Sequence, residues 1–274
     1  MSATSTVTYP QREGSASPMS SRSDIKPIPT TRLIAVELSK MFDTRAGFWL
    51  IMSVGILAVL ATISVIAFAP DEAIAYGTFS AAIGIPIAVL LPVIAILSVT
   101  SEYGQRTALT TYVLVPRRGR IIASKAAAAL IIGVSGVLVA FAVGALGNLI
   151  GSQIVGIDTV WDVTVLSASY VMLGNLLGMA IGFMLAVLVR NTPGAIVGYF
   201  VYSFVLPTIF GALAAFQEWF ADLQPWVDVN YTANLLYQDL MTSQAWQQLG
   251  VTSLIWILIP LLIGLRFVLR AEVK

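Results

Sequence analysis

The residues best suited to chemistry lie in one polar segment, 100–125, which separates two long apolar stretches. It begins with Glu102 and Tyr103, and residues 102–114 lack proline, so they can form a short helix that ends before Pro116. The segment holds five of the fifteen basic residues, namely Arg106, Arg117, Arg118, Arg120 and Lys125. Such cations can bind anionic lipid headgroups, at about 1 kcal/mol each. Headgroup binding explains the charge but not Glu102, Tyr103 or Thr107.

Catalytic and metal-binding chemistry has little support elsewhere in the chain. Cys and His are both absent, which removes cysteine nucleophiles, thiolate metal sites and the commonest general base near neutral pH. The sequence also has no GxxxxGK[ST] phosphate-binding loop. We therefore expect no enzyme and no resident cofactor or metal, and any ATP hydrolysis would belong to a separate partner.

The polar residues inside the apolar stretches are mostly uncharged. No charged residue lies near the middle of a stretch, whereas ion-coupled carriers normally need an intramembrane carboxylate. Asn175, Tyr199 and Tyr202 are candidates for lining a pathway, although interhelical hydrogen bonds are their commoner role. If the protein moves a substrate, we expect a largely apolar pathway and an external source of energy.

The elements that position these residues are membrane spans. The 274-residue chain is 58% hydrophobic and 11% charged, which excludes a water-soluble globule. Each of six apolar stretches is long enough to cross a hydrocarbon core of about 30 Å as a helix. They cover residues 48–69, 78–100, 126–150, 163–189, 195–216 and 249–269. The fold class is therefore an all-α polytopic membrane protein.

The charges are sorted between the two sides that these spans define. All fifteen Lys and Arg residues fall in segments on one side, and eight of the fourteen acidic residues fall on the other. Because Lys and Arg are retained in cytoplasmic loops, both termini are predicted to be cytoplasmic. We expect lipid and protein partners and no nucleic acid.

An amphipathic helix is predicted before the first span. Residues 1–30 are rich in Ser, Thr and Pro and are expected to form a disordered cytoplasmic tail, followed by a six-span domain over 31–274. Within 32–46, one face carries Ile34, Leu38, Met41 and Phe42 and another carries Glu37, Lys40 and Thr44. Thr30 or Thr31 is the expected cap. This helix suits the membrane–water interface, or else it only extends the first span.

The longest outer loop, 217–248, mixes three Trp and two Tyr with acidic residues. It is predicted to form one or two short helices broken at Pro225, which either seal the outer end of the bundle or take part in substrate exit. The fourth span carries Gly174, Gly178 and Gly182, a pattern that permits close helix packing within one chain or between two. Pro86, Pro92, Pro207 and Pro260 are expected to be tolerated kinks.

A resemblance brings these features together. Glu102-Tyr103-x-x-x-Thr107, then Leu114-x-Pro116-Arg117-Arg118 and Lys125 before an apolar span, is similar to the signature of permease subunits of type-2 ABC exporters. The Glu37-Leu38-x-Lys40 run, the six spans and the long last outer loop also resemble that family. Arg106 departs from the family, which often has Gly there, and the segment after Thr107 is less Leu-rich than usual.

The resemblance implies a bacterial plasma-membrane permease that pairs with a second copy or a paralogue and with separate ATP-binding subunits. It implies that 101–125 is the coupling loop, with a docking role for Glu102, Tyr103, Arg106 and Thr107 and for the helix that carries Glu37 and Lys40. For Arg117, Arg118 and Lys125 it leaves docking and lipid binding open. The expected substrate is an apolar or amphiphilic drug, lipid or peptide moved outward. The alternative is a membrane scaffold, sensor or immunity protein without transport.

Overall fold

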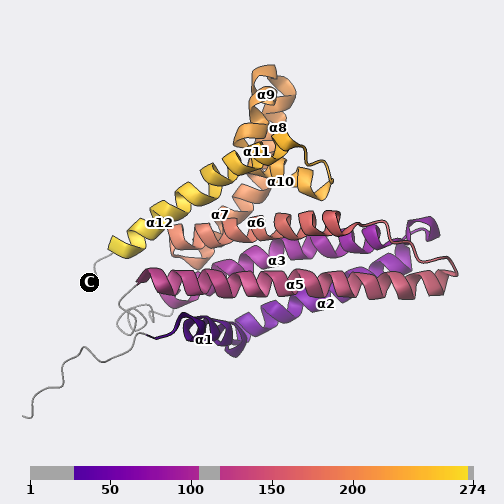
Figure 1. Cartoon of the computed structure of the whole chain (residues 1–274), viewed down its shortest axis with the longest axis horizontal. Coiled ribbons are helices and arrows are strands. Elements are labelled where there is room, and N and C mark those ends of the chain that lie inside the picture. Colours follow the sequence, from indigo (N-terminus) through magenta and orange to yellow (C-terminus); the bar gives the residue numbers. More distant parts are fainter. Residues whose placement is uncertain (1–27, 105–117, 271–274) are drawn as a thin grey trace, which may run out of the picture.

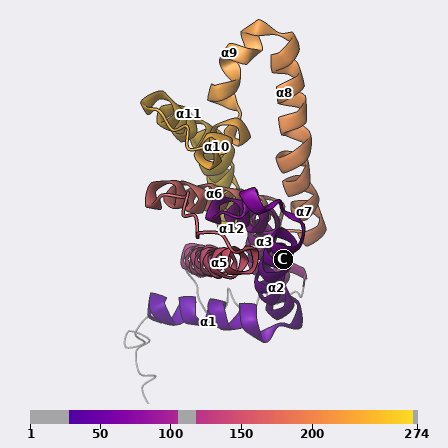
Figure 2. The same cartoon turned by 90° about the vertical axis from the view of Figure 1, so that its right-hand side faces the viewer.

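The computed structural model describes residues 28–104 and 118–270, and all regular structure in these two ranges is helical. Six of the helices are long and apolar enough to cross a membrane, which confirms an all-helical protein with six candidate spans. Four of them, α2, α3, α5 and α6, lie side by side, while the last two diverge from this group toward α9 (Figure 1). α1 lies crosswise at one edge of the bundle (Figure 2).

The elements follow one another closely along the chain. The first part contains α1 (Thr30–Asp43), α2 (Arg45–Phe68), the short 3-10 helix η2 (Asp71–Ala73), α3 (Tyr76–Gly104), α5 (Arg118–Val155) and α6 (Val165–Val189). The fifth span consists of α7 (Thr192–Phe200), the π-helical turn η3 (Val201–Val205) and α8 (Leu206–Phe216). Then come α9 (Glu218–Val227), α10 (Val229–Tyr237), α11 (Ser243–Ser253), the π-helical turn η4 (Leu254–Leu258) and α12 (Ile259–Arg270).

The first helix begins and ends earlier than the predicted 32–46. Pro29 occupies the position before its first turn, so the prediction of a Thr30 or Thr31 cap is wrong. Thr30 lies inside the helix, where its hydroxyl instead accepts a hydrogen bond from Arg120. The helix ends at Asp43 because Thr44 is extended and caps α2 by accepting a hydrogen bond from the Gly47 amide.

The spans extend beyond their predicted limits mainly at the end that carries α1. α3 continues through Gly104, and α5 begins at Arg118, so the predicted loop 101–125 is helical at both ends, and its middle part, 105–117, lies outside the described residues. The apolar pattern underestimated the length of both helices, because the polar residues at their ends remain helical where they bond to neighbouring elements. The predicted tail 1–30 also lies outside the described residues except for its last three positions.

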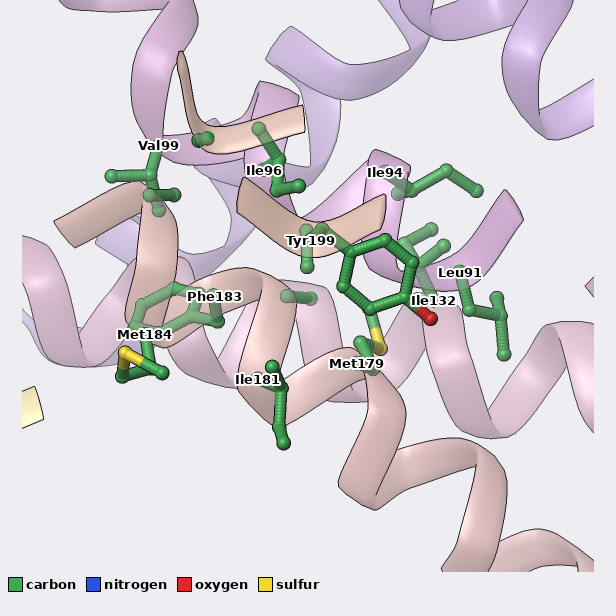
Figure 3. Packing of buried hydrophobic residues seen from close by; sticks show 14 of the residues in the cluster. Leu91, Ile94, Ile96, Val99, Ile132, Met179, Ile181, Phe183, Met184 and Tyr199 are labelled. Atoms are coloured by element: carbon green, nitrogen blue, oxygen red, sulfur yellow. The ribbon is translucent and has the colours of Figure 1, made fainter. Parts of the chain in front are cut away.

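The core is built around α3 and α6, which contribute most of the large buried side chains (Figure 3). The glycine stripe of α6, which consists of Gly174, Gly178 and Gly182, packs against other helices of the same chain. A Cβ atom at Gly182 would lie 2.7 Å from the Pro92 carbonyl oxygen of α3, and one at Gly174 would meet the Tyr237 ring of α10. Small residues let helix backbones approach closely, so Gly182 permits the short distance between α3 and α6.

The fifth and sixth spans share an irregularity. Each contains a five-residue π-helical turn, and a proline follows two residues after it, Pro207 in one and Pro260 in the other. Widened turns beside a proline accommodate its ring and its missing N–H group. The two turns face each other, since the rings of Tyr202 and Trp256 lie 5.7 Å apart.

The outer loop is helical, but not as predicted. α9 runs through Pro225 to Val227, so a break at Pro225 is wrong. The break falls at Asp228, whose Oδ1 accepts hydrogen bonds from the Asn230 and Tyr231 amides and starts α10. The Asp228 carboxylate satisfies two otherwise unpaired amides there, so the second helix of the loop starts at this residue. The last span begins at Ser243 within the predicted loop.

Candidate functional sites: a buried charge cluster and a tyrosine cavity

Four charged residues from three elements meet at the end of the bundle that carries α1. This charge cluster consists of Glu37 and Lys40 from α1, Glu102 from α3 and Lys125 from α5. Lys125 Nζ lies 2.6 Å from Glu37 Oε2 and 3.0 Å from Glu102 Oε1. Lys40 Nζ lies 2.8 Å from Glu37 Oε1 and 2.7 Å from Glu102 Oε1. Each cation therefore bridges both carboxylates, and the formal charges cancel.

Lys125 is the most deeply buried member. Its side chain is 3% exposed, against 42% for Lys40. Its ammonium group also donates to the Ser98 carbonyl oxygen at 3.1 Å, so all three of its hydrogens have an acceptor. The interpretation of Lys125 as a lipid-headgroup or partner contact does not fit this position, because its charge is already bound inside the protein.

Glu37, assigned to the polar face of α1, is likewise turned inward, whereas Thr44 of the same face is exposed. Glu37 is buried, whereas Phe42, assigned to the apolar face, is exposed. Glu37 can occupy the interior because two ammonium groups compensate the loss of its hydration. Burial by itself would lower the pKa of Lys40, but its hydrogen bonds and charge interactions with Glu102 and Glu37 outweigh that effect and raise the pKa above 10.5.

A second bond ties α1 to α5 nearby. The Arg120 guanidinium donates to the Ile28 carbonyl oxygen at 2.5 Å and to the Thr30 hydroxyl at 3.2 Å. The start of α1 and its middle are thus both attached to the first turns of α5. α1, α3 and α5 consequently form one connected unit at the two flanks of segment 105–117.

Of the other residues predicted to couple to a partner, the structure describes only Tyr103 and the backbone of Arg118. Tyr103 is partly buried and packs against the core. Arg118 begins α5, and only its backbone is described. The remaining four, Arg106, Thr107, Pro116 and Arg117, lie outside the described residues.

A cavity of about 350 Å³ adjoins the charge cluster between α1, α2 and α3. All four cluster residues contribute to its wall, and the rest is mainly apolar, with Leu50, Ile51, Ile94 and Leu97. Lys40, the half-exposed member, is the one that water reaches most readily.

A larger cavity, of about 480 Å³, lies between α3, α6, the fifth span, α9 and α10. We call it the tyrosine cavity because Tyr199, Tyr202, Tyr231 and Tyr237 line it. The three predicted pathway residues, Asn175, Tyr199 and Tyr202, all contribute to its wall. Its volume falls in the range typical of small-molecule sites, roughly 300–1,000 Å³.

The wall of this cavity is held by specific bonds. The Tyr199 hydroxyl donates to the Ala88 carbonyl oxygen of α3 at 2.9 Å, and the Trp256 indole donates to the Val227 carbonyl oxygen at 2.6 Å. The Asn175 amide donates to the Val171 carbonyl oxygen at 2.8 Å, while its Oδ1 has no hydrogen-bond partner among the described residues. Burial raises the pKa of the Tyr237 hydroxyl above its ordinary value.

Sequence reasoning missed the contribution of the outer loop to this site. Gln224, Asp228, Tyr231 and Tyr237 line the cavity from α9 and α10. The available signal was Asp228 itself, since Asp before a short helical segment is a typical capping residue. It would have marked the α9–α10 junction but not its position against α6.

Comparisons with known proteins do not identify this chain. No model of a known protein family matches it, and no curated protein matches it. The features that bear on function are therefore the charge cluster, the tyrosine cavity and the six candidate spans.

Proposed function

We propose that this chain is the membrane-spanning permease subunit of an ATP-driven exporter of the type-2 ABC class. In this proposal it lies in a bacterial plasma membrane with both termini in the cytoplasm. It pairs with a second permease, either another copy or a paralogue, and with separate ATP-binding subunits. Motion of those subunits moves an apolar or amphiphilic substrate outward.

The observation that carries the proposal is the charge cluster. Segment 105–117, with the motif residues Arg106, Thr107, Pro116 and Arg117, leaves α3 two residues after Glu102 and joins α5 seven residues before Lys125. Ion pairs of 2.6–3.0 Å join both flanks to α1. A force applied to that segment by a partner would therefore move α1, α3 and α5 together rather than bend one helix end.

Packing provides the path from the cluster to the tyrosine cavity. α3 contacts α6 closely at Gly182 and holds Tyr199 through the Ala88 carbonyl oxygen. Displacement of α3 would therefore reach the cavity wall through the close backbone contact at Gly182 and through the Tyr199 hydrogen bond. This supports a substrate pathway whose shape responds to events at the α1 end of the bundle.

The first test is purification of the tagged chain in mild detergent, with mass spectrometry of co-purifying proteins and an ATPase assay in nanodiscs. We expect an ABC ATPase at one copy per permease, with a hydrolysis rate that changes when the permease is present. Arg117→Ala/Arg118→Ala should weaken this association. Arg270→Ala, which removes an exposed cation on α12, is the matched control and should leave it intact.

A second test addresses orientation, and the lack of native cysteine makes it direct. Ser39→Cys on α1 should be protected from a membrane-impermeant maleimide in intact cells, whereas Asp222→Cys on α9 should react. The reverse pattern would contradict cytoplasmic termini. If no ATPase accompanies the folded protein, the exporter proposal fails and a scaffold, sensor or immunity role takes its place.

A further inference from the structure

The tyrosine cavity has a one-sided electrostatic character. Among the described residues that line it, none is Lys or Arg, and its single formal charge is the carboxylate of Asp228. Polar atoms around it are mostly tyrosine hydroxyl groups and side-chain amides, from Asn175, Gln224, Asn230 and Asn234. A cavity of this kind repels anions and offers favourable interactions to a bound positive charge.

Asp228 is buried without an opposite charge. The residue is 2% exposed, and no ion pair forms with it among the residues that the structure describes. Its Oδ1 accepts the two amides at the start of α10, and its Oδ2 accepts the Gln224 amide at 3.1 Å. Neutral donors compensate only part of the cost of burying a carboxylate, so a cation in the cavity would complete its environment.

Asn175 adds an independent observation. Its side chain belongs to the cavity wall, the residue is 4% exposed, and its Oδ1 accepts no hydrogen bond from any described group. A buried acceptor left without a donor costs about 1–3 kcal/mol. Because Oδ1 itself has almost no accessible surface, a ligand N–H group in the cavity can supply the missing donor once the Asn175 amide turns toward it.

The aromatic rings select the same kind of ligand. Four tyrosines and Phe204 line the cavity, and the aliphatic residues Leu177 and Ile181 line it with them. Aromatic faces attract ammonium groups, by about 0.5–2 kcal/mol depending on desolvation, and they also bury apolar surface. A molecule with a charged amino group and an apolar body would use both properties.

We propose that the tyrosine cavity binds amphiphilic organic amines in their protonated form. The ammonium group is attracted by Asp228 and the tyrosine faces and donates to wall acceptors such as Asn175, and the apolar body packs on the rings and aliphatic side chains. This inference deepens the proposed export function by naming its substrate class. Binding itself requires neither an ATPase nor nucleotide, so the two proposals can be tested separately.

The experiment uses the full chain in phosphatidylcholine nanodiscs without ATPase, and three dansyl probes of similar length. Dansylcadaverine carries a primary ammonium group, its N-acetyl derivative is neutral, and dansyl-6-aminohexanoic acid is anionic. Fluorescence titrations are corrected with empty nanodiscs to remove partitioning into lipid. We expect saturable binding of dansylcadaverine and at least tenfold weaker binding of the other two probes.

Two variants and a control locate the site. Asp228→Asn removes the charge but keeps a residue that caps helices equally well, so the fold should persist. It should weaken dansylcadaverine binding at least tenfold and leave the neutral probe unchanged. Asn175→Leu should weaken amine binding several-fold without loss of stability, and it serves as the test if Asp228→Asn does not fold. Asp222→Asn removes an exposed carboxylate of α9 outside the cavity and should bind the amine normally.

The inference is overturned if dansylcadaverine shows no saturable binding above empty nanodiscs, or if the three probes bind equally. It is also overturned if Asp222→Asn and Asp228→Asn weaken binding to the same extent, since the effect would then reflect surface charge. An ATPase partner without amine binding would reject this inference and leave the exporter proposal standing. Amine binding without an ATPase partner would support this inference and reject the exporter proposal.

Discussion

Replacement of Lys125 by methionine should strongly destabilise the protein, because it removes the most buried cation of the charge cluster. Glu37 and Glu102, with side chains 8% and 10% exposed, would then share only Lys40. Removal of one partner of a buried ion pair costs about 3–5 kcal/mol. Lys40 still lies within 2.8 Å of both carboxylates, so we expect about 2–4 kcal/mol.

The matched comparison is Lys40→Met, which removes the same charge from the same two carboxylates. Its side chain is 42% exposed, so water already solvates much of the ammonium group, and the expected cost is about 1 kcal/mol or less. The pair deletion Glu37→Gln/Lys125→Met leaves Glu102 with Lys40 and should recover most of the stability lost in Lys125→Met. If the stabilities of the three variants follow this order, the cost of Lys125→Met comes from the burial of its charge partners and not only from the loss of one positive charge.

The assay is equilibrium unfolding in mixed micelles with increasing SDS, followed by far-ultraviolet circular dichroism and tryptophan fluorescence. The double-mutant cycle over Glu37 and Lys125 gives the coupling free energy of this pair. We expect a coupling of at least about 1.5 kcal/mol. Equal destabilisation by Lys125→Met and Lys40→Met, or a coupling near zero, would refute the reasoning that Lys125 stabilises a buried carboxylate pair.

Three further predictions concern packing, pH and an unpaired acceptor. Gly182→Ala should destabilise the protein by about 1–3 kcal/mol, because the new methyl group would lie 2.7 Å from the Pro92 carbonyl oxygen. Gly178→Ala, whose methyl group would meet nothing closer than 3.8 Å, should be neutral or stabilising by up to about 1 kcal/mol. Lys40 has a raised pKa, so its contribution to stability should be complete below about pH 10.5 and disappear as the pH rises through the folded-state value. In the absence of ligand, Asn175→Leu should stabilise the protein by about 1 kcal/mol, because it removes a buried acceptor without a partner.

The same unfolding titration checks all three. Similar stabilities for the two glycine variants would contradict close backbone packing as the role of the stripe. The pH effect is measured as the difference between wild type and Lys40→Met from pH 8 to 12, and a difference that grows with pH would have the wrong sign. Marked destabilisation by Asn175→Leu would indicate that its amide bond to Val171 matters more than its unpaired oxygen.

The sequence could not determine which helix the glycine stripe contacts. Its spacing predicted a close helix contact, but contact within one chain and contact between two chains would have the same spacing. The structure places Gly182 against α3 and Gly174 against α10 of the same chain. The choice depends on how six apolar helices are arranged, and helices that are apolar on nearly every face carry no periodic signal for it.

For the charge cluster and the tyrosine cavity, too, the sequence pointed to single residues but not to the contacts between them. The sequence marks each of the four cluster residues separately, yet the hydrogen bond between Lys125 and Glu37 joins residues 88 positions apart. An amphipathic pattern assigns Glu37 to water, because a pattern along one helix cannot include a buried counter-ion from another. Asn175, Tyr199 and Tyr202 were likewise singled out without the α9 and α10 residues that complete the wall.

The sequence by itself determined the helical class and the number of spans, because crossing a hydrocarbon layer requires a local property, about 20 consecutive apolar residues. It also marked the few charged residues at the ends of these segments as candidates, because charged side chains are rare within membrane spans. Only the tertiary structure decided which charges neutralise one another, which glycine contacts which helix, and which tyrosines share a cavity. These depend on shape complementarity and on burial between segments far apart in the chain, and neither is encoded in a local pattern.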